Sequence, residues 1–418
     1  MKCDASTYAR RSISLGLTVF LFMCGVTAAV RAQTFTVLYA FSDNDDGAGP
    51  TGELIRDHQG NLYGTSNKAV FQLDVQGNLH TVRLPGNHFP FPSPSGNRLI
   101  RDFAGNLYGS TRYGYNHPPQ CKTSGQFGRD YGCGTVFKVD RAGQLTVLYA
   151  FNGIPDGAWP AAGLVRDADG NLYGTTLAGG RSSVHCTNGC GTVFKLDATG
   201  KETILYSFTG GSDGAFPNSE LVADPRGNLY GTTSEGGRGE GTVFRLTPSG
   251  KETALYNFIG GTDGAYPNGV AQDGQGNLYG TTSGGGNYED DCLNLGCGTV
   301  FKLSSTGKER VLYRFHSAPD GFGPTAGLIW DVAGNAYGTT YFGGPGCSFG
   351  NFSCGTVFQL DNTGRETILH NFVGTDGSTP QAGLIRDNAG NLYGTTSGGG
   401  NYDACPLVGC GTVFKLTP

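Results

Sequence analysis

Four arginines stand at the same place in successive copies of a repeated sequence. They are Arg56, Arg101, Arg166 and Arg386. Each follows a short apolar run and directly precedes an aspartate. Guanidinium groups that ring the mouth of a channel can hold an anion through charge-assisted hydrogen bonds. The alternative is that each arginine pairs with an aspartate of a neighbouring repeat, namely Asp57, Asp102, Asp167 or Asp387.

A second recurring phrase, Asp-Gly-Ala-x-Pro, places carboxylates in loops. It stands at residues 156–160, 213–217 and 263–267, and variants begin at Asp46, Asp320 and Asp376. Oxygen ligands on glycine turns suit Ca²⁺, so calcium binding is one interpretation. No phrase has the alternating acidic ligands of a calcium loop, and Asp-Gly is a common turn dipeptide. The phrase therefore favours structural turns, and we predict no cofactor.

Aromatic residues accompany these Asp-Gly phrases. They are Trp159, Phe216, Tyr266 and Phe322. Together they would form a platform for sugar rings, and the alternative is that each packs against the adjacent loop. The seven histidines share no repeat position, and the sequence holds no zinc-protease motif, nucleophile elbow or P-loop. A metal site built from irregular loops, as in a hydrolase or lyase, is the competing hypothesis.

Ten cysteines outside the N-terminal segment fall into five local pairs. These are Cys121/Cys133, Cys186/Cys190, Cys292/Cys297, Cys347/Cys354 and Cys405/Cys410. The other two repeats lack both cysteines, and joint presence or absence is what local disulfides predict. Zinc is disfavoured because no repeat supplies four ligands. Each disulfide would close a loop of roughly 5 to 13 residues and contribute about 2 to 3 kcal/mol.

The elements that position these residues are set by the phrase Gly-Asn-Leu-Tyr-Gly-Thr-Thr. It recurs seven times, starting at Gly60, Gly105, Gly170, Gly227, Gly276, Gly334 and Gly390. Each repeat contains four short runs rich in Val, Thr, Tyr and Phe, bounded by turn residues, which predicts a four-stranded antiparallel sheet. Seven such units predict an all-β fold, a seven-bladed β-propeller.

The two ends of the repeat region predict how the ring closes. The last repeat stops after its third strand at Leu416, and the segment 35–41 is a spare fourth strand. We expect the N-terminal strand to complete the last blade, which removes the open sheet edge. The expected blades span about residues 52–84, 96–151, 161–208, 218–258, 268–315, 325–372, and 381–418 with 35–41.

Residues 1–32 are predicted to be a signal peptide. Lys2, Arg10 and Arg11 precede an apolar run at residues 13–26, and small residues follow before Gln33. Its removal takes four basic residues and one acidic residue, so the formal charge falls from −5 to −8. This balance disfavours nucleic acid as a partner. We expect one exported propeller domain over 33–418, extracellular, periplasmic or at the cell surface, monomeric and without a transmembrane span.

The repeats resemble the GloVer-type tandem repeat family, which carries Gly-Asn-Leu-Tyr-Gly-Thr-Thr, then Gly-Thr-Val-Phe-Lys-Leu and a Leu-Tyr-x-Phe strand. The resemblance covers residues 35–418. It implies export and a propeller with strand order similar to NHL-type repeats, but no established reaction. Related proteins often end in a surface anchor, whereas this chain ends at Pro418. The sequence therefore favours a non-catalytic scaffold that binds a glycan or protein through its longer loops, with a metal-dependent hydrolase or lyase as the alternative.

Overall fold

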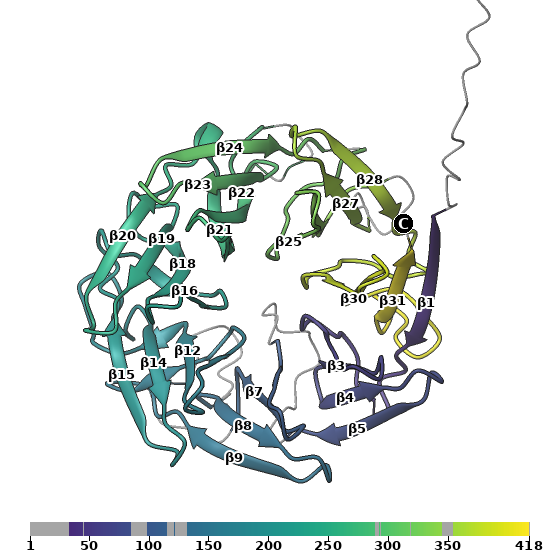
Figure 1. Ribbon diagram of the computed structural model, residues 1–418, viewed down its shortest axis with the longest axis horizontal. Coiled ribbons are helices and arrows are strands. Elements are labelled where there is room, and N and C mark those ends of the chain that lie inside the picture. Colours follow the sequence, from purple (N-terminus) through teal and green to yellow (C-terminus); the bar gives the residue numbers. More distant parts are fainter. Residues whose placement is uncertain are drawn as a thin grey trace, which may run out of the picture. The chain divides into compact units, whose positions relative to one another are not determined.

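The computed structural model is a ring of seven antiparallel sheets whose first strands lie innermost (Figure 1). It describes residues 33–44, 46–84, 98–114, 121, 132–288, 292, 294–317, 319–344 and 354–417. The segment 1–32, predicted to be a leader, lies outside these residues. No helix in the described ranges is long and apolar enough to cross a membrane. The seven-bladed propeller predicted from the repeats is confirmed.

The first four blades follow one strand pattern. Blade 1 contains β2 (Ile55–Arg56), β3 (Leu62–Thr65), β4 (Ala69–Leu73) and β5 (Leu79–Arg83). Blade 2 contains β6 (Ile100–Arg101), β7 (Leu107–Thr111), β8 (Thr135–Val139) and β9 (Leu145–Ala150). Blade 3 contains β11 (Val165–Arg166), β12 (Leu172–Thr176), β14 (Thr192–Leu196) and β15 (Glu202–Ser207). Blade 4 contains β17 (Val222–Ala223), β18 (Leu229–Glu235), β19 (Thr242–Leu246) and β20 (Glu252–Asn257).

The last three blades complete the ring. Blade 5 contains β21 (Ala265–Gln272), β22 (Leu278–Gly284), β23 (Thr299–Leu303) and β24 (Glu309–Arg314). Blade 6 contains β25 (Ile329–Trp330), β26 (Ala336–Thr340), β27 (Thr356–Leu360) and β28 (Glu366–Asn371). Blade 7 contains β29 (Ile385–Arg386), β30 (Leu392–Thr396) and β31 (Thr412–Thr417). Its outer strand is β1 (Thr34–Ala40), which pairs antiparallel with β31 from Thr34–Thr417 to Ala40–Thr412, as predicted.

The recurring phrase fastens the turn between the first and second strands. In blade 7, one oxygen of Asp387 accepts the backbone N–H groups of Ala389 and Asn391. The other accepts the Asn391 amide at 2.8 Å and the Tyr393 hydroxyl at 3.0 Å. Burial raises the pKa of Asp387, but these hydrogen bonds outweigh it and hold the pKa below its usual value. All seven phrase tyrosines make the same bond to their aspartate.

The core lies between neighbouring blades. The second glycine of each phrase pairs with the phenylalanine of the third strand, as Gly394 does with Phe414. A Cβ at Gly394 would lie 2.5 Å from the Phe414 ring, so the ring occupies the space that glycine leaves. A phenylalanine that follows the outer strand then inserts into the next blade. Phe372, for example, meets Phe414 edge-on at 5.3 Å.

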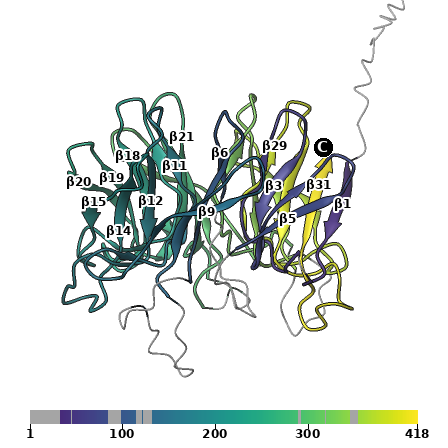
Figure 2. The ribbon, with the colours of Figure 1, turned by 90° about the horizontal axis from the view of Figure 1, so that it is seen from below.

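The two faces of the ring differ (Figure 2). The face with tight turns, here called the turn face, carries segments such as 387–390. The other, the loop face, carries the cysteine hairpins and the Asp-Gly phrases. Short extra strands form on the loop face, namely β10 (Gly157–Ala158), β13 (Ala178–Gly179) and β16 (Ala215–Pro217). In blade 3, β10 of the Asp-Gly phrase pairs with β13 in the loop after the second strand. In blade 4, β16 of the phrase pairs with the end of the second strand, β18. These pairings hold the Asp-Gly loops against the blades.

Four outer strands begin with a half-buried glutamate. They are Glu202, Glu252, Glu309 and Glu366, each with one carboxyl oxygen that is buried without a hydrogen-bond partner. Burial, followed by the charge of a nearby Asp-Gly aspartate, raises the pKa of Glu202, Glu252 and Glu309 to about 7 and that of Glu366 to about 8.

These glutamates predict a stability that falls as the pH rises. A carboxyl whose pKa is raised on folding stabilises the protein fully below its unfolded pKa, and the contribution is lost as the pH rises through the folded pKa. We expect Tm to be higher at pH 5.5 than at pH 8.5, a window in which the turn aspartates stay ionised. Replacing all four glutamates with glutamine should reduce this difference, and Glu53, whose pKa burial also raises to about 7, should keep part of it. An unchanged difference in the quadruple variant would show that other groups cause it.

Candidate functional site

Three aromatic residues occupy a strained backbone position on the loop face. Trp159, Phe216 and Tyr266 have φ values of 61°, 57° and 57°, which non-glycine residues rarely adopt. At the same position, blades 1 and 6 use Gly49 and Gly323. The left-handed conformation costs a non-glycine residue about 1 to 2 kcal/mol. We call these three residues the aromatic row. They lie in the segments that lead into the consecutive blades 3, 4 and 5.

Phe322 does not belong to the aromatic row, although we expected it to. It stands one position earlier in its phrase, where the other phrases have alanine or serine. Its side chain is 7% exposed and stacks on Phe342 at 5.0 Å, so it is part of the core. The strained position is the residue directly before the proline of the phrase, and in blade 6 this residue is Gly323.

Two members of the aromatic row are tied to the cysteine hairpin of the preceding blade, whereas the backbone N–H of Tyr266 donates to the carbonyl of Glu240 at 3.0 Å. The backbone N–H of Trp159 donates to the carbonyl of Cys133, and that of Phe216 donates to the carbonyl of Cys190, both at 2.8 Å. The indole Nε1 of Trp159 also donates to the carbonyl of Gly132 at 3.1 Å. Burial and then Glu240 raise the pKa of Tyr266. One side of each ring therefore packs on a neighbouring loop, as the alternative interpretation expected, while part of each ring stays exposed.

The disulfides that shape these hairpins are present. The structure contains Cys121–Cys133, Cys186–Cys190, Cys292–Cys297 and Cys405–Cys410. Cys354 is also disulfide-bonded, while Cys347, its expected partner, lies outside the described residues. The local pairing predicted from the joint occurrence of the cysteines is thus confirmed for the four pairs described in full.

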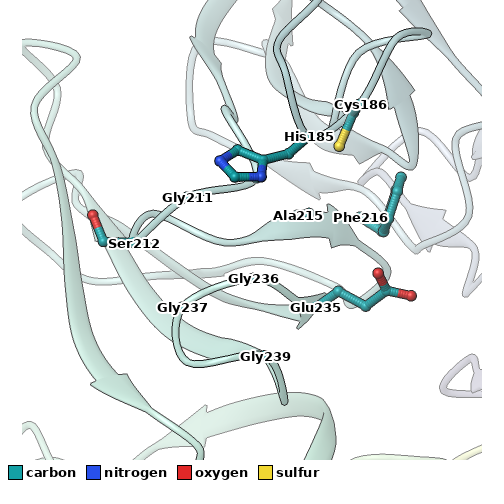
Figure 3. A pocket seen from close by; sticks show the side chains of 11 residues that line it. His185, Cys186, Gly211, Ser212, Ala215, Phe216, Glu235, Gly236, Gly237 and Gly239 are labelled. Atoms are coloured by element: carbon teal, nitrogen blue, oxygen red, sulfur yellow. The ribbon is translucent and has the colours of Figure 1, made fainter.

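A cavity of about 450 Å³ opens beside the middle residue of the aromatic row. Phe216, Ser212 and Glu235 of blade 4 line it, together with His185 and Cys186 of the blade 3 hairpin. Figure 3 shows His185 and Glu235 with Ala215 and Phe216 between them. The glycines 210, 211, 236, 237 and 239 form most of the remaining wall. The cavity thus combines one aromatic ring with a carboxylate, an imidazole and a hydroxyl.

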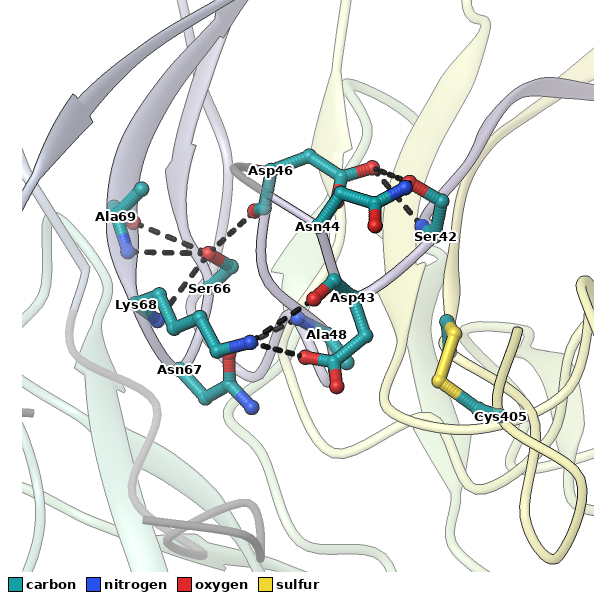
Figure 4. A network of polar contacts seen from close by, with 11 residues as sticks. Ser42, Asp43, Asn44, Asp46, Ala48, Ser66, Asn67, Lys68, Ala69 and Cys405 are labelled. Atoms are coloured by element: carbon teal, nitrogen blue, oxygen red, sulfur yellow. Dashed lines mark hydrogen bonds and ion pairs between the residues drawn. A yellow bond between two sulfur atoms is a disulfide. The ribbon is translucent and has the colours of Figure 1, made fainter. Parts of the chain in front are cut away.

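The Asp-Gly aspartates are held by donors from their own turns. At the junction of blades 7 and 1, Asp46 Oδ2 accepts the Ser42 N–H at 2.9 Å (Figure 4). The same oxygen also accepts the Tyr39 hydroxyl at 3.1 Å. The carbonyl of Asp46 accepts the Ser66 hydroxyl at 2.8 Å. Tyr149, Tyr206, Tyr256 and Tyr313 make the equivalent bond in later blades. These contacts support the structural-turn interpretation, and calcium binding stays an untested hypothesis.

The four arginines lie at the opposite end of the blades from the aromatic row. Arg56, Arg101 and Arg166 place their guanidinium groups 5.7 to 5.8 Å from the phrase tyrosine of the preceding blade. A Cβ on the turn glycine of the same blade would lie 3.0 to 3.2 Å from the Nη2 atom of each arginine, Arg386 included. The arginines therefore follow the turn face, and anion binding there stays a prediction separate from any site on the loop face.

A charged cluster inside the ring was not predicted from the sequence. The residue before the first buried leucine or valine of a blade is Gly163, Gly269, Gly327 or Gly383 in four blades, but Glu53, Arg98 and Glu220 in blades 1, 2 and 4. Arg98 Nε lies 3.4 Å from Glu53, and its Nη1 lies 3.4 Å from Glu220. We call these three residues the channel cluster. Aligning the repeats with one another shows this departure, whereas a motif search does not.

No three His, Cys, Asp or Glu side chains come together as a metal site within the described ranges. Of the chain's seven histidines, His185 lines the loop-face cavity and His316 contacts Asn287. His88 and His117 lie outside the described residues.

Seven four-stranded blades arranged in a ring define the chain as a β-propeller repeat protein. The model of the Gloeobacter/Verrucomicrobia repeat matches it in three overlapping stretches, residues 69–291, 122–350 and 224–418. The chain belongs to this repeat family, which confirms the resemblance seen in the sequence. Comparison with curated protein sequences finds no match.

Solved structures with a similar fold come from proteins with different roles. A streptogramin B lyase matches with a TM-score of 0.59 and 16% identity, covering 92% of this chain and 97% of that one. A virginiamycin B lyase from Staphylococcus aureus has a TM-score of 0.59 and 12% identity, covering 92% and 99%. An extracellular domain described as part of a one-component system from B. thetaiotaomicron has a TM-score of 0.54 and 14% identity, covering 92% and 42%. At these identities the likeness concerns the fold alone.

Proposed function

We propose that the protein is an exported, non-catalytic propeller that binds a carbohydrate on its loop face. The observation that carries this proposal is the aromatic row, in which three consecutive blades keep an aromatic side chain where the backbone favours glycine. Strain of this kind persists where the surroundings over-determine it, and it is concentrated at functional sites. Three such residues in adjacent blades suit an extended ligand better than a compact one.

The cavity beside Phe216 suits one sugar ring of such a ligand. Its volume of about 450 Å³ lies within the usual range of small-molecule sites. The C–H groups of a sugar pack on the negatively polarised face of an aromatic ring. Glu235 can accept hydrogen bonds from sugar hydroxyls, while Ser212 and His185 can both donate and accept. The disulfides are stable in an oxidising compartment and thus support export.

Binding of a panel of soluble oligosaccharides, measured by calorimetry, tests the proposal. We expect Phe216→Ala to weaken binding about tenfold, which corresponds to about 1.4 kcal/mol and is of the size expected for one aromatic contact. The matched control is Phe103→Ala, which removes a fully exposed ring from a turn of blade 2 and should leave binding unchanged. Full affinity in Phe216→Ala, or binding only to a protein partner, would refute the carbohydrate site.

A hydrolase or lyase is the second candidate, and the channel cluster is the observation that favours it. Glu53 and Glu220 keep 22% and 29% of their side-chain surface accessible, and carboxyl groups of this kind can act as general acids or bases. Chromatography of a bound oligosaccharide after long incubation would reveal cleavage products. Metal analysis of the purified protein tests the metal-dependent form of this candidate. Unchanged oligosaccharide after incubation favours the binding function.

A further inference from the structure

The strained position has the same backbone geometry in blades 1 and 3 to 7. Its φ value lies between 51° and 62° in these blades, while the corresponding segment before blade 2 lies outside the described residues. In each of the six blades its backbone N–H donates to a carbonyl at the end of the preceding blade's hairpin, at 2.8 to 3.0 Å. In blade order the residues are Gly49, Trp159, Phe216, Tyr266, Gly323 and Thr379. This shared hydrogen bond holds the backbone left-handed whatever side chain the residue carries.

The fold does not need a side chain at the strained position. Blades 1 and 6 have glycine there, and a Cβ at Gly323 would meet no described atom closer than 3.8 Å. Blade 7, however, has Thr379. A left-handed φ is a clear outlier for a β-branched residue, and backbone strain of this kind is concentrated at functional sites. Blade 7 is therefore a fourth blade that keeps a side chain where the backbone favours glycine.

Thr379 supports a group of polar side chains between blades 6 and 7. Its hydroxyl lies 2.9 Å from the hydroxyl of Ser397, which accepts a hydrogen bond from Gln381 Nε2, also at 2.9 Å. Burial raises the pKa of Tyr341, and a hydrogen bond with the Gln381 side chain opposes this rise, so the two side chains are in contact. We call Tyr341, Thr379, Gln381 and Ser397 the polar junction.

The polar junction lies directly beside the strained positions of both blades. The backbone N–H of Tyr341 donates to the carbonyl of Gly323 at 3.1 Å, and that of Ser397 donates to the carbonyl of Thr379 at 3.3 Å. Tyr341 and Gln381 are half-buried, so part of each side chain reaches solvent. A glutamine amide can make four hydrogen bonds, and the contacts with Ser397 and Tyr341 use two of them. The polar junction therefore has hydrogen-bonding capacity left for a ligand.

We propose that the polar junction is a second subsite for the carbohydrate that the aromatic row binds, so this inference rests on the proposed function. Tyr341 and Gln381 would form hydrogen bonds with the hydroxyl groups of one sugar residue, because a hydroxyl both donates and accepts. The four side chains are uncharged at neutral pH, which suits a neutral sugar. Blades 3 to 7 follow one another around the ring (Figure 1). The ligand is thus a linear, neutral glycan that follows the loop face from the aromatic row to blade 7.

Calorimetry with cello-, xylo-, manno- and chito-oligosaccharides, each as the disaccharide and the hexasaccharide, tests the proposal. We expect at least one hexasaccharide to bind at least tenfold more tightly than its disaccharide, which fills only the cavity beside Phe216. Tyr341→Phe removes a single hydroxyl and should weaken hexasaccharide binding about five- to tenfold, as for one lost hydrogen bond, with disaccharide binding unchanged. The matched control, Tyr230→Phe, removes the hydroxyl of a half-buried tyrosine on the turn face and should change neither affinity.

A gain of affinity is a second test that does not depend on loss of function. Gly323→Tyr places a ring at the strained position of blade 6, between the aromatic row and the polar junction, where a Cβ has room. A hexasaccharide that crosses this blade should bind more tightly to the variant, while the disaccharide should not.

The two proposals fail in different ways. Unchanged hexasaccharide binding in Tyr341→Phe, or equal weakening of the disaccharide and the hexasaccharide, would overturn the second subsite. If Phe216→Ala still weakens both ligands in that case, the proposed function stands. Binding of none of the oligosaccharides would overturn both proposals.

Discussion

Phe41→Ala is expected to lower the free energy of unfolding by about 3 to 5 kcal/mol, the usual cost of truncating a buried phenylalanine. Phe41 is fully buried directly after β1, and its ring meets Phe71 of blade 1 at 5.3 Å. The substitution therefore opens a cavity at the one junction where two distant parts of the chain close the ring. Urea denaturation followed by far-ultraviolet circular dichroism measures the change.

Phe103→Ala provides the matched control for this experiment. The Phe103 side chain is fully exposed on a turn, so its removal should change stability by less than about 0.5 kcal/mol. A loss in Phe41→Ala no larger than in the control would mean that β1 contributes little to ring closure. Blade 7 would then be stable with three strands, contrary to the role assigned to the N-terminal strand.

Gly394→Ala is expected to destabilise the protein by about 1 to 3 kcal/mol through overpacking. Its added Cβ would lie 2.5 Å from the Phe414 ring and 2.9 Å from Leu384, and both neighbours are completely buried. The phenylalanine cannot retreat because Phe372 of the preceding blade packs against it. Thermal unfolding of the variant should therefore begin at a lower temperature.

Gly274→Ala separates overpacking from the general effect of replacing glycine. Gly274 lies in a turn, has no left-handed φ, and a Cβ there would meet no described atom within 4 Å. That change should be neutral or slightly stabilising, because alanine has fewer unfolded conformations than glycine. Equal destabilisation by Gly394→Ala and Gly274→Ala would contradict the packing role of the phrase glycine.

Much of the architecture could be predicted because repetition provides seven independent copies of the same signal. The strand runs, the turns and the spare strand at residues 35–41 all gave the blade count and the ring closure that the structure confirms. The hydroxyl bond from each phrase tyrosine to its aspartate was missed, because a tyrosine in a strand is explained equally well by packing alone.

The candidate sites were less predictable because they depend on which side chains meet across the ring. Glu220 and Arg98 are 122 residues apart in the chain, and only the closed ring brings them together. The left-handed backbone at Trp159 and Phe216 could not be predicted either, because tryptophan and phenylalanine rarely adopt that conformation. Phe322 was misplaced because a blade can shift its aromatic residue by one position and move it into the core.

The pairing of Thr34 with Thr417 has a mechanical consequence. Both ends of the described chain leave the ring at the same corner, on the turn face, so a tether at either end leaves the loop face directed away from the point of attachment. A force that pulls the two ends apart acts first on the Thr34–Thr417 pair. It then breaks the following residue pairs between β1 and β31 one after another, up to Ala40–Thr412. Under such a force β1 should therefore separate from β31 before any other strand pair of the ring, and the remaining blades should unfold only after this separation.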